Sequence, residues 1–294
     1  MVKPSISFLG AGRLARALAP GLKQRGYLID EIVVRNRATT KGNAFALATG
    51  VSAKVRTLEK AVFNSAILWF CVPDDAITPL AAKLSVSHSW SGKIVFHSSG
   101  ALPSSALAIL RLKGAAVASV HPMMSFSDES VPLPPGITFG VEGDAKAVNV
   151  ANQIIKDVQG IRISLKPSNK AFYHLMGTFS SPLVIALLAG AGHLGRAAQL
   201  SPANTRNVIG PLVQATIQNY LRNGLVAAYT GPVRRGDIQT IKMHLGALKN
   251  DPILLDAYRS LARVAIRELP VRRMKEIESL LRGARKRKSR AGKL

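Results

Sequence analysis

Residues 5–15 read SISFLGAGRLA, and this stretch decides the fold. A short apolar run is followed by Gly10, Gly12 and Ala15 in G-x-G-x-x-A spacing, and apolar residues at helical spacing come next. In a phosphate-binding turn the first glycine permits the tight turn, the second lets the backbone approach a pyrophosphate, and the small third residue lets helix and strand pack closely. The helix N-terminus then faces the anion. The stretch predicts a dinucleotide site at Gly10, Ala11, Gly12, Arg13 and Leu14, and the alternative is a glycine turn without a ligand.

The second apolar run ends in Val34-Arg35-Asn36-Arg37, about 20 residues beyond the glycine turn. NAD-preferring sites usually carry an acidic residue there, which binds the ribose 2′-hydroxyl. This chain has two arginines instead, and guanidinium groups bind phosphate oxygens in a fork. We therefore expect Arg35, Asn36 and Arg37 to favour NADP(H) over NAD(H), the alternative being that the arginines are solvated surface residues.

Strand-like and helical segments alternate over residues 1–166, whereas strand-like segments are absent after Pro167. Alternation of this kind predicts an α/β fold with a doubly wound, mostly parallel sheet. Residues 167–281 read as helices separated by Pro and Gly, which predicts an all-helical second domain for substrate binding and dimerisation. Residues 282–294 read RGARKRKSRAGKL and form a separable basic tail that we expect to be disordered.

The composition limits the possible partners. Forty Lys and Arg against sixteen Asp and Glu give a formal net charge of +24, which attracts anions in general. The tail could contact phosphates nonspecifically, but aromatic residues are 5% of the chain and none lies in the tail, so we expect no specific nucleic-acid partner. The single cysteine, Cys71, excludes an intramolecular disulfide framework. The longest apolar stretch, residues 182–192, is about half of the ~20 residues of a membrane span, so we expect a cytoplasmic protein without membrane contact.

Several candidate residues follow the ends of predicted strands, where ligands bind in such folds. We expect Val72, Pro73, Ser98 and Gly100 to line the cofactor. His97 and His121 each close a strand-like run, and histidine is a suitable proton donor near neutral pH. The alternative for each histidine is a ring hydrogen-bonded into the loop scaffold.

The start of the helical region carries a second group of candidates. Lys170, His174 and Ser181 are spaced i, i+4 and i+11 and would share one face of a helix, suiting an acidic or carbonyl substrate in an interdomain cleft. The alternative is a solvated polar helix turn. Further along, Arg234 and Asp237 are candidates for substrate binding, with a helix-capping role as the alternative for Asp237. Six scattered histidines and one cysteine suggest no metal site.

Five short motifs carry a resemblance: FCVPDDAI (70–77), HSSGAL (97–102), HPMMSF (121–126), KAFYH (170–174) and TGPVRRGD (230–237). In this order they resemble bacterial proteins that join a Rossmann-like domain to a helical C-terminal domain of unknown function. That group is similar to pyrroline-5-carboxylate reductase, ketopantoate reductase and the deazaflavin-dependent NADP reductases. The resemblance extends to about residue 281 and implies an NADP-linked oxidoreductase. It also implies a helical domain like the C-terminal domain of 6-phosphogluconate dehydrogenase and a homodimer formed through it.

Together these observations predict an NADP(H)-dependent oxidoreductase. A hydride would pass between the nicotinamide and a small, anionic carbonyl or imine substrate, and Lys170, His174, His97 and His121 are the candidates for its chemistry. The alternative is a protein that binds NADP(H) as a sensor or scaffold without turnover.

Overall fold

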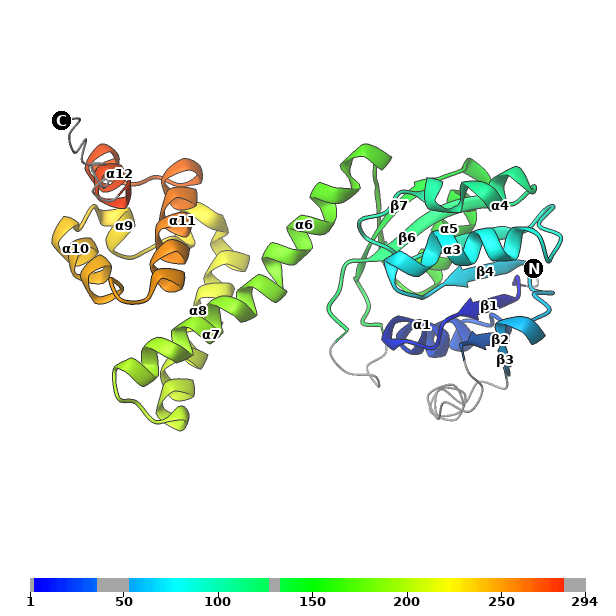
Figure 1. Ribbon diagram of the computed structural model, residues 1–294, viewed down its shortest axis with the longest axis horizontal. Coiled ribbons are helices and arrows are strands. Elements are labelled where there is room, and N and C mark those ends of the chain that lie inside the picture. The colour runs from blue at the N-terminus through cyan, green and yellow to red at the C-terminus, as the bar shows by residue number, and fades with distance from the viewer. Residues whose placement is uncertain (1–2, 36–52, 127–132, 283–294) are drawn as a thin grey trace, which may run out of the picture. The chain divides into compact units, whose positions relative to one another are not determined.

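A computed structural model describes residues 3–35, 53–126 and 133–282 (Figure 1). The chain divides into two compact units, Met1–Leu183 and Val184–Leu294.

The first unit contains an eight-stranded sheet in the order β3-β2-β1-β4-β5-β6-β7-β8. All neighbouring strands pair in parallel except β6 and β7, which are antiparallel. The sheet therefore confirms the expected doubly wound α/β fold, with one reversal near its β8 edge. The strands are β1 (Ile6–Leu9), β2 (Ile29–Val34), β3 (Lys54–Thr57), β4 (Ile67–Phe70), β5 (Ile94–His97), β6 (Ala116–Pro122), β7 (Thr138–Gly143) and β8 (Ile161–Ser164).

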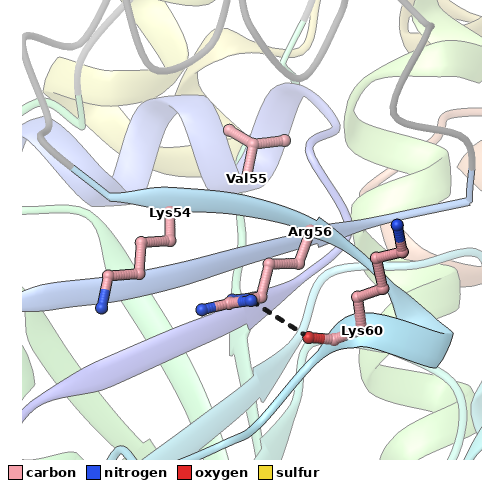
Figure 2. A pocket seen from close by; sticks show the side chains of 4 residues that line it. All are labelled: Lys54, Val55, Arg56 and Lys60. Atoms are coloured by element: carbon pink, nitrogen blue, oxygen red, sulfur yellow. Dashed lines mark hydrogen bonds between the residues drawn. The ribbon is translucent and has the colours of Figure 1, made fainter.

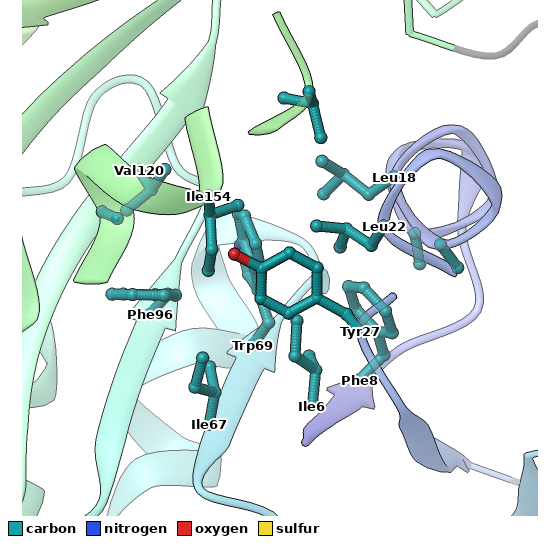
Figure 3. Packing of buried hydrophobic residues seen from close by; sticks show 14 of the residues in the cluster. Ile6, Phe8, Leu18, Leu22, Tyr27, Ile67, Trp69, Phe96, Val120 and Ile154 are labelled. Atoms are coloured by element: carbon teal, nitrogen blue, oxygen red, sulfur yellow. The ribbon is translucent and has the colours of Figure 1, made fainter. Parts of the chain in front are cut away.

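Helices cover both faces of this sheet. On one face α1 (Arg13–Gln24) and α5 (Ala145–Asp157) enclose a core that contains Phe8, Trp69 and Phe96 (Figure 3). On the other face α3 (Asp74–Ser85) and α4 (Ala108–Leu112) pack on Leu68 and Phe70. The continuous apolar run of β4 is explained by this arrangement, because alternate side chains of a central strand enter opposite cores. Short 3-10 helices occur at η1 (Leu58–Lys60) and η2 (Ser104–Leu107).

The parallel strands bring four chain segments to one edge of the sheet. Leu9 of β1 pairs with Phe70 of β4, Phe70 pairs with His97 of β5, and His97 pairs with Ser119 of β6. The residues that follow these positions therefore emerge at the same carboxyl edge, where open α/β sheets bind ligands.

After β8 come η3 (Pro167–Asn169) and α6 (Lys170–Ser180), both within the first unit. The sequence placed a domain boundary after residue 166, where strands cease. In the structure α6 is tied to the sheet, because the Lys170 ammonium donates to the carbonyl of Ser99 and to the hydroxyl of Ser119. Ser181 leaves the helical conformation with φ −134° and ψ −82°, so one long sequence pattern becomes two helices.

The second unit is helical. Its helices are α7 (Pro182–Ala197, whose first two residues belong to the first unit), α8 (Pro202–Ala228), α9 (Pro232–Arg235), α10 (Ile238–Ala247), α11 (Pro252–Glu268) and α12 (Met274–Arg282). The last three helices enclose a small core of Ile241, Ala262, Ile266, Ile277 and Leu281. None of the residues of α7 is buried, and only Thr205 is buried in α8.

One helical stretch of the described chain, Pro167–Ala197, is long and apolar enough to cross a membrane by length and composition. A single such helix is weak evidence for a membrane span.

Candidate functional site

The glycine turn between β1 and α1 has the geometry of a phosphate-binding loop. Gly10 has φ +108°, and a Cβ atom there would lie 2.4 Å from the backbone oxygen of Cys71. Gly12 precedes α1 with ordinary φ, and no side chain of the described residues caps the first N–H groups of that helix. These N–H groups and the positive end of the helix dipole favour an anion. The turn therefore fits the pyrophosphate of a dinucleotide.

The neighbouring cofactor candidates surround this turn. Ala11 and Leu14 are half-buried against the core, whereas Arg13 is exposed at the start of α1. Arg35 is exposed directly after β2. Asn36 and Arg37 lie outside the residues that the structure describes.

The ends of β4 and β5 complete the carboxyl edge. Val72 packs against the core, and one of its methyl groups would lie 3.1 Å from a Cβ added at Gly10. Pro73 is the N-cap residue of α3. Ser98 accepts a hydrogen bond of 2.7 Å from the indole of Trp69, which fixes the first residue after β5.

His97 is fully buried and both of its ring nitrogens are engaged. Nδ1 accepts from the backbone N–H of Ser99 (3.2 Å), and Nε2 lies 3.1 Å from the carbonyl oxygen of Pro103. Burial, helped by the charge of Lys170, lowers the pKa of His97 to about 4. The structure thus places His97 inside the loop scaffold, with no ring nitrogen left to meet a substrate.

His121, His174 and Ser181 meet at one cavity of about 340 Å³ in the first unit, which β6, the following loop and α6 enclose. Met123, Met124, Gly177 and Thr178 also line it. The two imidazole rings are 6.1 Å apart, centroid to centroid, and nearly perpendicular.

Gly100 lies between the same two rings. A Cβ atom at this position would be 2.6 Å from His174 and 2.8 Å from Nε2 of His121. The loop after β5 therefore reaches the histidines through bare backbone, which links this predicted cofactor-lining residue to the cavity.

Lys170 lies in the protein interior behind this cavity. Its side chain is fully buried, and its ammonium donates to the Ser99 carbonyl (2.9 Å) and to the Ser119 hydroxyl (2.5 Å). Burial lowers the pKa of Lys170 to about 8, although the charges of Glu142 and Asp74 oppose the shift. Lys170 therefore differs from His174 and Ser181, which face the cavity, although all three were expected on one helix face.

Arg234 and Asp237 belong to the second unit. The Arg234 guanidinium donates to the backbone oxygens of Val226, near the end of α8, and of Tyr229, which follows that helix. Asp237 is the N-cap residue of α10 and accepts two hydrogen bonds from Arg235, at 2.9 and 2.6 Å.

A different cavity, of about 250 Å³, lies at the edge strand β3 and is basic (Figure 2). Lys54, Arg56 and Lys60 line it, with Lys54 and Arg56 on one side of the strand. Part of this charge is already compensated, because Arg56 Nε lies 2.7 Å from the buried carboxylate of Glu31. No group of three or more metal-ligating side chains occurs within the described parts of the chain.

Sequence reasoning gave no role to two residues that shape the site. Tyr173 is buried beside His121, with ring centroids 5.7 Å apart, and its hydroxyl lies 3.5 Å from the backbone oxygen of His121. Ser99 joins β5 to α3, because its hydroxyl donates to Asp74 at 2.7 Å and accepts from two backbone N–H groups. Both lie within quoted motifs, but spacing alone does not distinguish them from their neighbours.

A glycine turn followed by a helix N-terminus at the carboxyl edge of a parallel sheet is the arrangement of a dinucleotide-binding Rossmann domain. Residues 5–97 match the family described as NADP oxidoreductase, coenzyme F420-dependent, and residues 137–265 match a domain of unknown function, DUF2520. The chain therefore combines an NADP-oxidoreductase Rossmann domain with a DUF2520 domain, which confirms the resemblance seen in its motifs and NADP(H) as the cofactor.

Solved structures share this fold. A Bacteroides fragilis protein assigned as an NADP oxidoreductase is 21% identical, with 89% of this chain and 97% of that chain covered at a TM-score of 0.73. An imine reductase variant from Myxococcus stipitatus, in complex with NAD⁺, is 19% identical (90% and 94% covered, TM-score 0.63). A pyrroline-5-carboxylate reductase from Coxiella burnetii is 18% identical (90% and 97% covered, TM-score 0.56). No curated protein sequence matches the chain.

Proposed function

We propose that this protein is an NADP(H)-dependent oxidoreductase that transfers a hydride between the nicotinamide and the carbon of a small C=O or C=N substrate. The observation that carries the proposal is the cavity at His121 and His174, because it opens at the same sheet edge as the glycine turn. When bound, the cofactor supplies the hydride, and the protein must hold the substrate and manage one proton.

Different residues of the chain bind the cofactor and the substrate. Backbone N–H groups of Gly12 and Arg13 hold the pyrophosphate, and Arg35 with Arg37 holds the 2′-phosphate. Val72, Pro73, Ser98 and Gly100 line the remaining cofactor surface. In the cavity His121 and His174 face the reacting group, and the Ser181 hydroxyl orients the substrate.

The C=N alternative rests on the structures that this chain resembles, which include an imine reductase and a pyrroline-5-carboxylate reductase, and the C=O alternative rests on the sequence. The sequence favoured an anionic substrate because of Lys170 and Arg234. Both cations already have partners within the chain, so the proposal keeps a small carbonyl or imine substrate without requiring its charge. The matched family description names coenzyme F420, which makes a deazaflavin the second candidate for the hydride partner.

We also propose that a second copy of the chain covers the exposed apolar surface of α7 and α8. Large side chains on these helices are well exposed, including Ile185 at 65%, Leu212 at 65% and Leu221 at 73%. Apolar patches of this extent mark interaction sites on soluble proteins. The proposed protein is a cytoplasmic homodimer in which this surface is buried between the two copies. Size-exclusion chromatography with light scattering tests the dimer, and a monomer at micromolar concentration would contradict it.

The test of function has two stages. Titration with NADPH and NADH, followed through nicotinamide fluorescence, should show tight binding of NADPH and weak binding of NADH. NADPH consumption is then measured with a panel of carbonyl compounds, cyclic imines and a deazaflavin. Tight NADPH binding without consumption by any panel member would favour the alternative of a non-catalytic NADP(H) sensor.

A further inference from the structure

The two ring nitrogens of His121 lie in different surroundings. Nδ1 is sealed from solvent and has no hydrogen-bond partner among the described residues. Nε2 is not among the sealed atoms, and it points to the side of the ring where Gly100 and the cavity lie. A bound molecule therefore meets His121 through Nε2.

Burying an N–H group without an acceptor is rarer in proteins than leaving an acceptor under-satisfied. The sealed position consequently suits the bare lone pair of Nδ1, and the single proton of a neutral imidazole then resides on Nε2. This tautomer places an N–H donor at the cavity.

The groups packed around His121 oppose a second proton on its ring. The Lys170 ammonium and the His174 ring approach it from α6, Tyr173 of the same helix covers one side, and His97 lies on the neighbouring strand β5. None of these groups is an anion. Burial, then Lys170 and His174, lower the pKa of His121 to about 4.

The position of Lys170 is fixed by the fold. Its hydrogen bonds to Ser99, just after β5, and to Ser119 hold the charge against β6, the strand that also carries His121. A mobile surface lysine would be screened by water, whereas this buried charge is screened less.

We propose that His121 works as a neutral imidazole that donates a hydrogen bond from Nε2–H to the substrate oxygen or nitrogen, and that Lys170 is the positioning residue that keeps it neutral. Hydride adds to the carbon, and the C=O or C=N π pair moves onto the heteroatom. The heteroatom then takes its proton from water, and His121 keeps its own. A neutral histidine is an established electrophile for polarising a carbonyl group. The assignment of a substrate to this donor rests on the proposed function, but the tautomer does not.

The first experiment records imidazole ¹⁵N–¹H spectra of the unliganded protein between pH 5 and 8, with His121→Gln to identify the signal. We expect the Nε2–H tautomer throughout this range, without titration. A proton on Nδ1, or a midpoint near the ordinary histidine value of about 6.5, would overturn the proposal.

The second experiment compares Lys170→Met with Lys166→Met, a matched change at an exposed lysine four residues earlier. The first variant should move the His121 titration upward, toward the ordinary histidine value, and the second should leave it unchanged. An unshifted titration in a folded Lys170→Met protein would refute the positioning role. If Lys170→Met fails to fold, Lys170→Gln removes the charge but keeps a donor for Ser99 and Ser119, and an unshifted titration there would refute the positioning role.

Failure of the proposed function gives a result that differs from failure of the His121 assignment. A neutral Nε2–H tautomer in a protein that reduces no carbonyl or imine would leave the structural assignment intact and remove only the reaction.

Discussion

Three glycines in and before α1 provide a graded test of the dinucleotide site. Gly10→Ala places a Cβ 2.4 Å from a backbone oxygen at a residue with φ +108°. The left-handed backbone costs about 1–2 kcal/mol for a residue with a side chain, and the overpacking adds roughly 1–3 kcal/mol. Because a unit of this size loses about 2–4 °C in Tm per kcal/mol, we expect Tm to fall by roughly 4–20 °C.

Gly12→Ala is the informative partner of this change. Its Cβ would lie 3.8 Å from the nearest atom, the Cys71 oxygen, and φ is −76°, so the fold should tolerate it with little change in Tm. The methyl group would instead stand between the backbone and the pyrophosphate. We expect the Kd for NADPH to rise at least tenfold, which corresponds to about 1.4 kcal/mol.

Gly21→Ala, in the last turn of α1, is the control. Apart from its chain neighbours and the backbone of its own helix, no described atom lies within 4 Å of the added Cβ, and alanine is the better helix former by about 0.5–1 kcal/mol. Tm should therefore rise slightly with NADPH binding unchanged. Thermal melts and fluorescence titrations of the three variants check the series. Unchanged NADPH binding by Gly12→Ala would refute the assignment of this turn to the pyrophosphate, and unchanged stability of Gly10→Ala would refute its geometry.

The remaining predictions concern pH, cofactor choice, the histidine pair and the tail. The pKa of His97 is lowered to about 4, so His97 binds fewer protons in the folded than in the unfolded state. The free energy of unfolding should therefore fall as pH drops from about 6.5 to 4. Urea melts of His97→Gln should show a smaller dependence of this free energy on pH. Arg35→Asp should move the ratio of NADPH to NADH affinity toward NADH by at least tenfold, and an unchanged ratio would contradict the 2′-phosphate assignment. Gly100→Ala should lower kcat/KM at least tenfold with NADPH affinity less affected, because its methyl group collides with both imidazole rings, and full activity would exclude the described packing. A chain shortened after Leu281 should bind NADPH as the full chain does, which titration of both proteins will check.

Most strands of the first unit could be predicted because their apolar runs are short, continuous and bounded by glycine or proline. β3 could not: Lys54-Val55-Arg56-Thr57 is polar because it is an edge strand with one exposed face. The antiparallel pairing of β7 with β6 could not be predicted from the sequence either, because a buried strand has a similar composition in either direction.

The sequence predicts which residues of the site follow the ends of strands, but it does not predict how deeply each side chain is buried. Position after a strand was enough to bring His97 and His121 to the carboxyl edge. It could not tell that His97 has both nitrogens engaged, whereas His121 faces a cavity. Helical spacing likewise grouped Lys170 with His174. The sequence alone does not distinguish a buried lysine that donates to two neighbouring segments from a lysine that faces solvent.

The anchoring of Lys170 also decides where this chain can be divided. A fragment that ends at residue 166 would lose the amine that binds the Ser99 carbonyl and the Ser119 hydroxyl. It would also lose Tyr173, whose ring a Cβ at Gly140 would meet at 2.7 Å. Ser99, Ser119 and the surface of β7 at Gly140 would then be exposed to solvent. For dissecting the protein, the nucleotide-binding half is therefore the stretch through residue 183, and α6 must be kept with the sheet although its sequence is that of the helical half.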